Sequence, residues 1–118
     1  MALAQLAGEP LILLDIPPSR DYFTGLLKAA GITPRLAFAS PSLELVRGLV
    51  GRGLGYSLLV TRPAGDRTYD GLALAARPIA DRVAGSDVAL ACLAGVRPSR
   101  AATAFGGDCQ AWFAERRR

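Results

Sequence analysis

The stretch between residues 44 and 59 constrains the fold more than any other part of the chain. Apolar side chains recur there at helical spacing, and the helical pattern ends at Gly53 and Gly55. A short apolar run at residues 56–60 follows at once and is typical of a buried strand. Ser40, which is followed by proline, stands where a helix N-cap is expected. The sequence therefore predicts a capped helix, a tight glycine turn and a strand.

The preceding part of the chain repeats this order of elements. Residues 11–15 form a continuous apolar run and predict a strand, and a helix capped by Ser19 is expected to follow and to end at Gly31. A second strand is expected at residues 35–39. Strands that are joined by helices pair in parallel with right-handed crossovers. We therefore predict an α/β fold, with a small mixed, mostly parallel sheet flanked by helices.

The pattern changes after residue 60. Residues 72–79 and 87–93 each predict a further strand, and no helical pattern lies between them. A last helix is expected to open at Ser99, and its two adjacent glycines, Gly106 and Gly107, predict a kink or a break. The chain therefore reads as one small α/β domain followed by a terminal helix.

The composition is that of one globular domain and excludes several classes of protein. About half of the residues are apolar, which argues against disorder. No apolar run approaches the roughly 20 residues of a membrane-spanning helix, and the first residues lack the basic start of a signal peptide. We therefore expect a cytoplasmic protein. The net charge of +4 does not indicate nucleic-acid binding, because the last three residues are arginines and no basic run alternates with aromatic side chains.

The residue inventory argues against an enzyme. The chain has no histidine, so it lacks the commonest general base and metal ligand. The GxSxG elbow, the Walker loop and the dinucleotide fingerprint are all absent from the sequence. Cys92 and Cys109 are too few for a thiolate metal site, and we expect both to be buried thiols. We therefore predict no catalysis, no cofactor and no metal.

A series of landmarks runs through nearly the whole chain, from about Leu6 to Phe113. In order, these are residues 6–14, 19–23, 31–35, 42–50, 53–57 and 69–71, followed by Phe105, Cys109, Trp112 and Phe113. Each landmark alone is weak, but their order and spacing together are fairly specific. On these residues the chain resembles the C-terminal lobe of the effector-binding domain of LysR-type transcriptional regulators.

The resemblance implies a two-lobed binding domain of the type 2 periplasmic-binding-protein kind. A small effector would lie between the lobes, and closure would be transmitted to an N-terminal winged helix-turn-helix on DNA. The chain departs from this pattern because it lacks the helix-turn-helix and nearly all of the first lobe. Residues 1–96 would be the second lobe, and residues 97–118 a hinge and a helix that packs on the missing lobe or on another subunit.

Two loops of the predicted sheet are candidates for an effector site. Ligands collect beyond the carboxyl ends of parallel strands, and the loops at residues 15–20 and 38–42 leave such ends. Both loops bring serines to a helix N-terminus, where free N–H groups and the helix dipole favour an anion. The candidate binding residues are Ser40, Ser42 and Ser19, with Phe38 as an apolar wall and, through the family resemblance, Tyr56 and Ser57.

Each candidate also has a structural interpretation. The serines can simply cap helices, and Phe38 and Tyr56 can be core aromatics. Arg20 could pair with an acidic effector or be a solvated surface residue.

The sequence thus predicts an effector-sensing domain of a LysR-type regulator, which binds a small, carboxylate-like molecule and contacts DNA only through a domain absent from this chain. The alternative is a free-standing oligomeric ligand- or protein-binding module from a truncated reading frame, without DNA binding. In either case we expect self-association, as a dimer or a larger assembly, because an uncovered apolar face tends to be covered by another subunit. The expected contact is an exposed sheet edge or the aromatic face of the terminal helix, formed by Phe105, Trp112 and Phe113.

Overall fold

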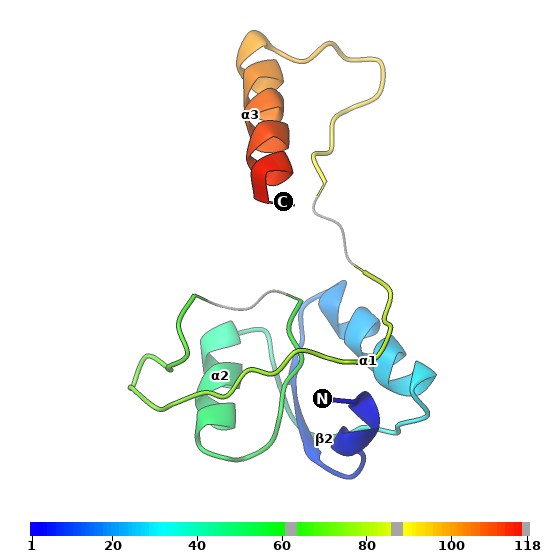
Figure 1. Cartoon of the computed structure of the whole chain (residues 1–118), viewed down its shortest axis with the longest axis vertical. Helices are drawn as coiled ribbons and strands as arrows, with labels where there is room; N and C mark the ends of the chain where they lie inside the picture. The colour runs from blue at the N-terminus through cyan, green and yellow to red at the C-terminus, as the bar shows by residue number, and fades with distance from the viewer. Residues whose placement is uncertain (61–63, 86–88, 117–118) are drawn as a thin grey trace. The chain divides into compact units, whose positions relative to one another are not determined.

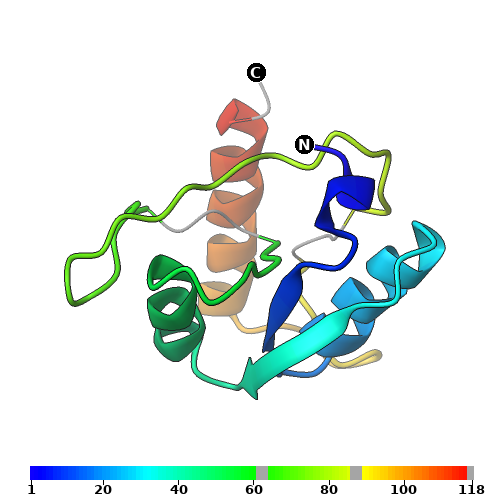
Figure 2. The same ribbon diagram turned by 90° about the horizontal axis from the view of Figure 1, so that it is seen from below.

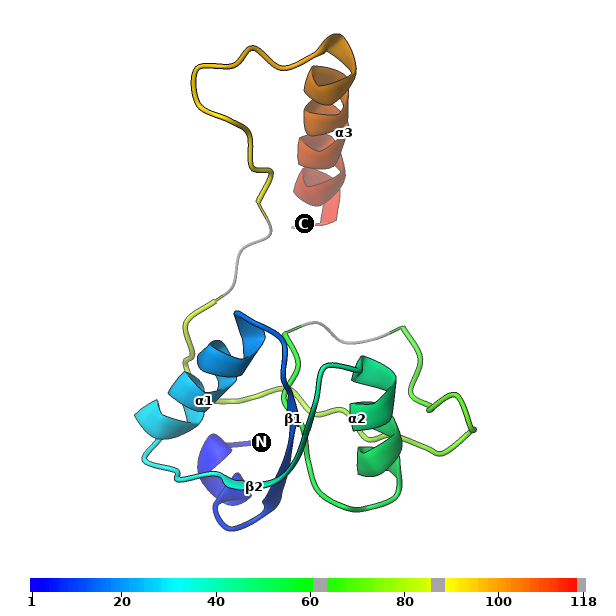
Figure 3. The same cartoon turned by 180° about the vertical axis from the view of Figure 1, so that it is seen from behind.

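The computed structural model describes residues 1–60, 64–85 and 89–116. The chain divides into two units, Met1–Ala84 and Gly85–Arg118, and each is described by itself. The first unit contains the short helix η1 (Leu3–Leu6), strand β1 (Pro10–Leu14), helix α1 (Ser19–Ala29), strand β2 (Arg35–Ser40) and helix α2 (Leu43–Gly51), as labelled in Figure 1 and Figure 3. The second unit contains helix α3 (Arg100–Arg116). The predicted α/β class is confirmed.

Strands β1 and β2 form a parallel sheet, as the β-α-β order of the sequence predicts. Leu14 pairs with Ser40 at the carboxyl end, and a register shift follows Leu11, so that Ile12 pairs with Phe38. Within the described residues, the predicted strand at residues 56–60 is reduced to one parallel bridge between Leu11 and its first residue, Tyr56. The sheet therefore has two full strands and the beginning of a third.

The two helices α1 and α2 lie on opposite sides of the sheet (Figure 3). Residues of β1 alternate between the two sides, as strand geometry requires. Leu11 and Leu13 belong to the main apolar cluster on the α1 side, whereas the fully buried Ile12 lies outside that cluster. The members of the cluster are Leu3, Leu6, Leu11, Leu13, Phe23, Leu27, Ile32 and Leu58.

Helix α2 ends in the glycine turn that the sequence predicts. Gly53 has a φ of 74°, its N–H donates to the carbonyl of Val50 at 2.9 Å, and the N–H of Leu54 donates to the carbonyl of Leu49 at 3.2 Å. These two bonds are those of a Schellman motif, in which the residue with positive φ is usually glycine. Helix α1 ends at Ala29, close to the predicted stop at Gly31.

Residues 72–79 do not form the predicted strand. Apart from one antiparallel bridge between Arg67 and Ala73, this segment has no ladder partner among the described residues. It runs instead as extended chain past η1, where Ala80 donates to the carbonyl of Met1 at 2.9 Å and Asp81 accepts from the N–H of Leu3 at 2.7 Å (Figure 2). Residues 72–79 themselves bond back to residues 66–68 through Leu72 and Leu74, and Pro78 accepts from the N-terminal ammonium of Met1, so no ladder forms along this segment.

In the second unit, α3 begins where the sequence predicts, because the hydroxyl oxygen of Ser99 accepts a hydrogen bond from the N–H of Ala102 at 3.2 Å. The expected kink at Gly106 and Gly107 is wrong, since α3 is continuous from Arg100 to Arg116. Each glycine inside a helix is only about 1 kcal/mol less favourable than alanine. The other residues of the helix can outweigh this cost.

Two further expectations for the second unit are wrong. Residues 89–93 of the predicted strand have no strand partner among the described residues, and residues 87 and 88 lie outside them, as do residues 117 and 118 of the basic tail. Cys92 is exposed and not a buried thiol. The division at residue 96, which concerns packing on a first lobe, stays a prediction. Within the described part of the chain, none of the helices has the length and apolarity to span a membrane.

Candidate functional site

The two loops that the sequence singled out lie together at the carboxyl edge of the sheet. One loop leaves β1 at Asp15 and enters α1, and the other leaves β2 at Ser40 and enters α2. A main-chain hydrogen bond joins them, because the N–H of Asp15 donates to the carbonyl of Ser40 at 2.9 Å. Parallel pairing of β1 with β2 produces this arrangement, since it brings both carboxyl ends to the same edge.

Ser42, and not Ser40, is the N-cap of α2. The Ser42 hydroxyl oxygen accepts a hydrogen bond from the N–H of Leu45 at 3.3 Å, and the Ser40 hydroxyl oxygen accepts one from the N–H of Ser42 at 3.1 Å. Ser40 is only 7% exposed, whereas Ser42 is exposed. Because each serine accepts through its oxygen, each still has a hydroxyl proton to donate. The loop therefore offers hydrogen-bond donors at the end of a helix.

The prediction that Ser19 caps a helix is wrong. Ser19 is the first residue of α1, and the N-cap is Pro18, which makes no side-chain cap bond among the described residues. Ser19 is half-buried in the loop that follows Asp15. Phe38 lies on β2 two residues before Ser40, so both point to the same side of the sheet, and Phe38 is 47% exposed and not a core residue.

Tyr56 and Ser57 are not beside the serine loop. Tyr56 bridges to Leu11, near the start of β1, whereas Ser40 pairs with Leu14 at its end. The Tyr56 hydroxyl and the Ser57 hydroxyl are buried and have no hydrogen-bond partner among the described residues. Burial, and after it the negative charge of Glu9, raises the pKa of Tyr56. The structure thus brings Ser40, Ser42 and the loop of Ser19 together and places Tyr56 at the other end of β1.

Two arginines that are paired with acids lie on the elements next to the serine loop. Arg20 lies 3.1 Å from the carboxylate of Asp15 and 3.4 Å from that of Asp21. On α2, Arg47 lies 2.7 Å from the carboxylate of Glu44. Each cation of these pairs is therefore partly neutralised by an acid of its own loop or helix.

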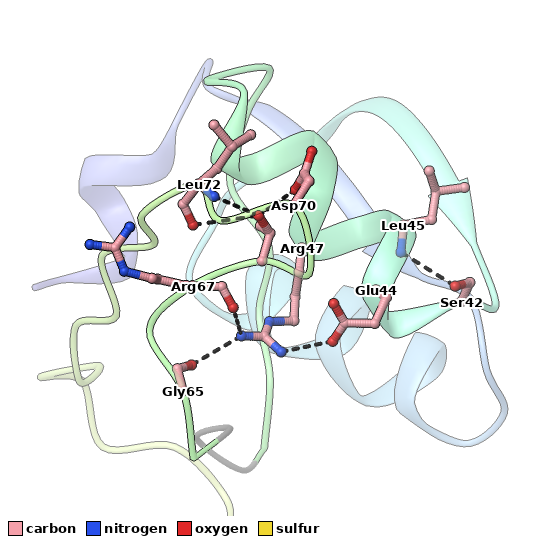
Figure 4. Close-up of polar contacts among 9 residues, drawn as sticks. Ser42, Glu44, Leu45, Arg47, Gly65, Arg67, Asp70 and Leu72 are labelled. Carbon is pink, nitrogen blue, oxygen red and sulfur yellow. Dashed lines mark hydrogen bonds and ion pairs between the residues drawn. The ribbon is translucent and has the colours of Figure 1, made fainter.

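Arg47 also fixes the chain that follows α2. Its guanidinium donates to the main-chain carbonyl of Gly65 at 3.0 Å and to that of Arg67 at 2.7 Å (Figure 4). The side chain is only 12% exposed. No sequence pattern singles out Arg47, because an arginine three residues after a glutamate on a helix is typical of a solvated surface pair.

A hairpin turn at residues 68–71 is held by Arg52, the C-cap residue of α2. Asp70 accepts hydrogen bonds from the Thr68 hydroxyl and from the guanidinium of Arg52. The bond from Thr68, and after it the one from Arg52, lowers the pKa of Asp70. Thr68 also accepts from the N–H of Leu72 at 2.9 Å, beside Arg47 and its partners in Figure 4. These contacts order the hairpin but do not form part of the serine loop.

An open groove of about 620 Å³ lies away from the serine loop, between α1 and residues 81–84. Its walls include Leu3, Tyr22, Leu26 and Val83, and none of the predicted binding residues lines it. No group of three or more acidic or cysteine side chains within the described residues could hold a metal ion. What the serine loop can supply is a set of hydrogen-bond donors for a small acceptor.

Comparisons with known proteins identify chains of similar sequence and fold. The model of the LysR substrate binding domain matches residues 1–114. The crystal structure of HinK, a LysR family transcriptional regulator from Pseudomonas aeruginosa, is 45% identical over 95% of this chain, with a TM-score of 0.90. The PA01 protein of the same species, described as a LysR family regulator, is 52% identical over 70% of the chain, with a TM-score of 0.68.

A third similar structure is the C-terminal domain of a protein described as a LysR family regulator from Rhodococcus sp. RHA1. It is 43% identical over 70% of this chain, with a TM-score of 0.67. The chain spans only 39%, 30% and 40% of the three solved chains, respectively. Among curated proteins, no significant match is found.

Proposed function

The chain belongs to the LysR substrate binding domain family, and on that premise we propose that it senses a small anionic effector within a transcriptional regulator. The observation that carries this proposal is the pair of loops joined by the bond between Asp15 and Ser40. Their position at the carboxyl ends of parallel strands is where open α/β sheets bind ligands.

The chemistry of the serine loop favours an anion. The hydroxyls of Ser40 and Ser42 can each donate one hydrogen bond, and the first N–H groups of α2 have no partner within the helix. The positive end of the α2 dipole adds an attraction for negative charge. The exposed ring of Phe38 would supply an apolar contact for the rest of the effector.

Within a whole regulator, the effector would act by favouring one conformation of the binding domain. A ligand shifts such an equilibrium only when it binds the two conformations with different affinity. The DNA contact would come from a helix-turn-helix domain, which is not part of this chain. Because a regulator works beside its DNA, we place the protein in the cytoplasm.

Replacing Ser42 by alanine tests the site. We expect Ser42→Ala to weaken the binding of acetate, used as a probe, by about tenfold, because it removes a hydrogen bond to a charged group. The loss of the N-cap should lower the free energy of unfolding by about 1 kcal/mol. Binding is measured by NMR titration of the whole chain, and stability by urea denaturation.

The matched control is Ser99→Ala. Ser99 caps α3 in the same way as Ser42 caps α2, so its replacement should cost similar helix stability and leave acetate binding unchanged. An unchanged acetate affinity in Ser42→Ala would remove Ser42 from the site.

We also propose that two copies of the chain associate. Within the described residues, β2 is paired on one side only, and its side chains Leu36 and Phe38 are 56% and 47% exposed. Parallel sheets are normally covered, and an open apolar edge is a site for pairing with another chain. On α3, Phe105, Trp112 and Phe113 are also exposed, so the terminal helix is a second candidate contact.

Self-association is tested with Leu36→Lys, which places a charge on the open edge. We expect a dimer for the original chain at high micromolar concentration, and a dimer dissociation constant at least about tenfold higher for the variant. Leu54→Lys is the control, because Leu54 is exposed but lies outside β2. Light scattering coupled to size exclusion gives the mass, and a monomeric original chain at this concentration would refute the proposal.

A further inference from the structure

We infer that Arg20 is the side chain by which the serine loop distinguishes a carboxylate from a neutral ligand, and that Asp15 competes with the carboxylate for Arg20. This inference rests on the proposed function and names a specificity-determining residue for the same site. The relevant geometry is the ion pair between Arg20 and Asp15, on the loop that is bonded to Ser40.

The position of Arg20 follows from the fold. Asp15 is the first residue after β1, and Arg20 is the second residue of α1, so both belong to the connection that leaves the carboxyl end of β1. The guanidinium lies 3.1 Å from the Asp15 carboxylate, and the main-chain N–H of the same Asp15 donates to Ser40. The cation is therefore held by the residue that joins the two loops of the proposed site.

Arg20 differs from Arg47 in how it is held. Arg47 is 12% exposed and is bound by Glu44 and by the main-chain carbonyls of Gly65 and Arg67, so it is fixed in place. Arg20 is 47% exposed, and its ion-pair partners are two carboxylates. Exposed ion pairs of this kind contribute little to stability and exchange partners at small cost. Arg20 can thus turn to a new acceptor, whereas Arg47 cannot without releasing the loop.

The chemistry of Arg20 indicates the class of ligand. A guanidinium binds a carboxylate through two parallel hydrogen bonds, and the Asp15 carboxylate is the same kind of acceptor. A small carboxylate at the serine loop would take the place of Asp15 on Arg20 and accept from the Ser40 and Ser42 hydroxyls. An isosteric amide has one acceptor oxygen and no charge, so it could accept one hydrogen bond from Arg20 but would lack the ion pair and the second parallel bond.

The test compares acetate with acetamide as probes on the whole chain, by NMR titration. Asp15→Asn removes the closer of the two carboxylates and leaves Arg20 paired with Asp21 alone, so it should raise acetate affinity about fivefold, which corresponds to one exposed ion pair. Arg20→Met keeps an unbranched apolar side chain but removes the guanidinium group, and it should lower acetate affinity about tenfold. Arg20→Lys keeps the charge alone and should give an intermediate value. In each of the three variants, acetamide affinity should change less than acetate affinity, because the amide carries no charge.

The matched control for net charge is Glu44→Gln. It removes one negative charge from the other ion pair, while Arg47 stays bound to its two carbonyls. The acetate affinity of this variant should change about twofold or less, because the charge of Glu44 acts on the bound acetate only at a distance and is screened by salt. Urea denaturation of each variant shows that the fold is retained.

The possible outcomes separate the inference from the proposed function. If Arg20→Met leaves acetate binding unchanged while Ser42→Ala weakens it, the site stands and the role of Arg20 is overturned. If Ser42→Ala leaves acetate binding unchanged while the Arg20 variants alter it, the serine loop is not the binding site. The proposed assignment of the effector site to Ser40 and Ser42 would then be wrong. Equal gains in Asp15→Asn and Glu44→Gln would assign the effect to net charge and overturn the inference. So would an Asp15→Asn variant that binds no acetate.

Discussion

Replacing Gly55 by alanine is expected to lower the free energy of unfolding by about 3 kcal/mol, which combines overpacking with backbone strain. A Cβ at this position would lie 2.2 Å from the carbonyl oxygen of Pro10, and φ is 156°. That carbonyl accepts the hydrogen bond from the N–H of Tyr56 at 2.9 Å, so it cannot retreat without breaking the bridge to β1. The substitution therefore acts on the contact that brings the chain after α2 back to the sheet.

The control for Gly55→Ala is Gly53→Ala in the same turn. Gly53 has a φ of 74°, but no heavy atom of the described residues would lie within 4 Å of its added Cβ. Alanine there should cost about 1 kcal/mol, the strain of the left-handed conformation alone. Urea denaturation followed by circular dichroism measures both. A cost at Gly55 no larger than the cost at Gly53 would contradict the close approach to Pro10.

Arg47→Met is expected to lower the free energy of unfolding by about 2 to 3 kcal/mol, because it leaves a partly buried acid and two carbonyls without their donor. Glu44 would lose its partner at 2.7 Å, and the carbonyls of Gly65 and Arg67 would lose theirs. The loop after residue 64 should consequently open. Amide hydrogen exchange at residues 64–74 should become faster than in the original chain.

Arg52→Met, at the C-cap of the same helix, is the matched control. Arg52 pairs with Asp70, but the two side chains are 52% and 46% exposed. Exposed ion pairs contribute at most about 1 kcal/mol, so we expect a smaller loss of stability than for Arg47→Met. Equal losses in the two variants would show that Arg47 does not fix the loop more strongly than a surface pair does.

The local elements of the first unit could be predicted because their signals are local. Two strands, the two helices between and after them, and the glycine ends of both helices all follow from periodicity and from the residues at the helix ends. Parallel pairing follows from the β-α-β order, and it alone places Ser40 and Asp15 at one edge. The placement of Ser40 and Asp15 at one edge of the sheet could therefore be predicted from the sequence.

The features that could not be predicted depend on contacts with residues that are distant in the sequence. Residues 72–79 have the composition of a strand, but Leu72 and Leu74 form hydrogen bonds back to residues 66–68, and Pro78 accepts one from the N-terminal ammonium of Met1. Arg47 has the spacing of a surface pair, and only the fold shows that its guanidinium reaches the main chain at Gly65. Tyr56 was placed in the site by resemblance, and its bridge to Leu11 puts it near the start of β1.

The proposed effector site is tested most directly by an amide NMR titration of the whole chain with acetate. The shifts should concentrate on Ser40, Ser42, the first turn of α2 and Asp15, because acetate is expected to bind at the joined loops. Shifts confined to the groove beside α1, at Tyr22, Leu26 and Val83, would contradict this proposal, as would a spectrum without change at Ser40 and Ser42.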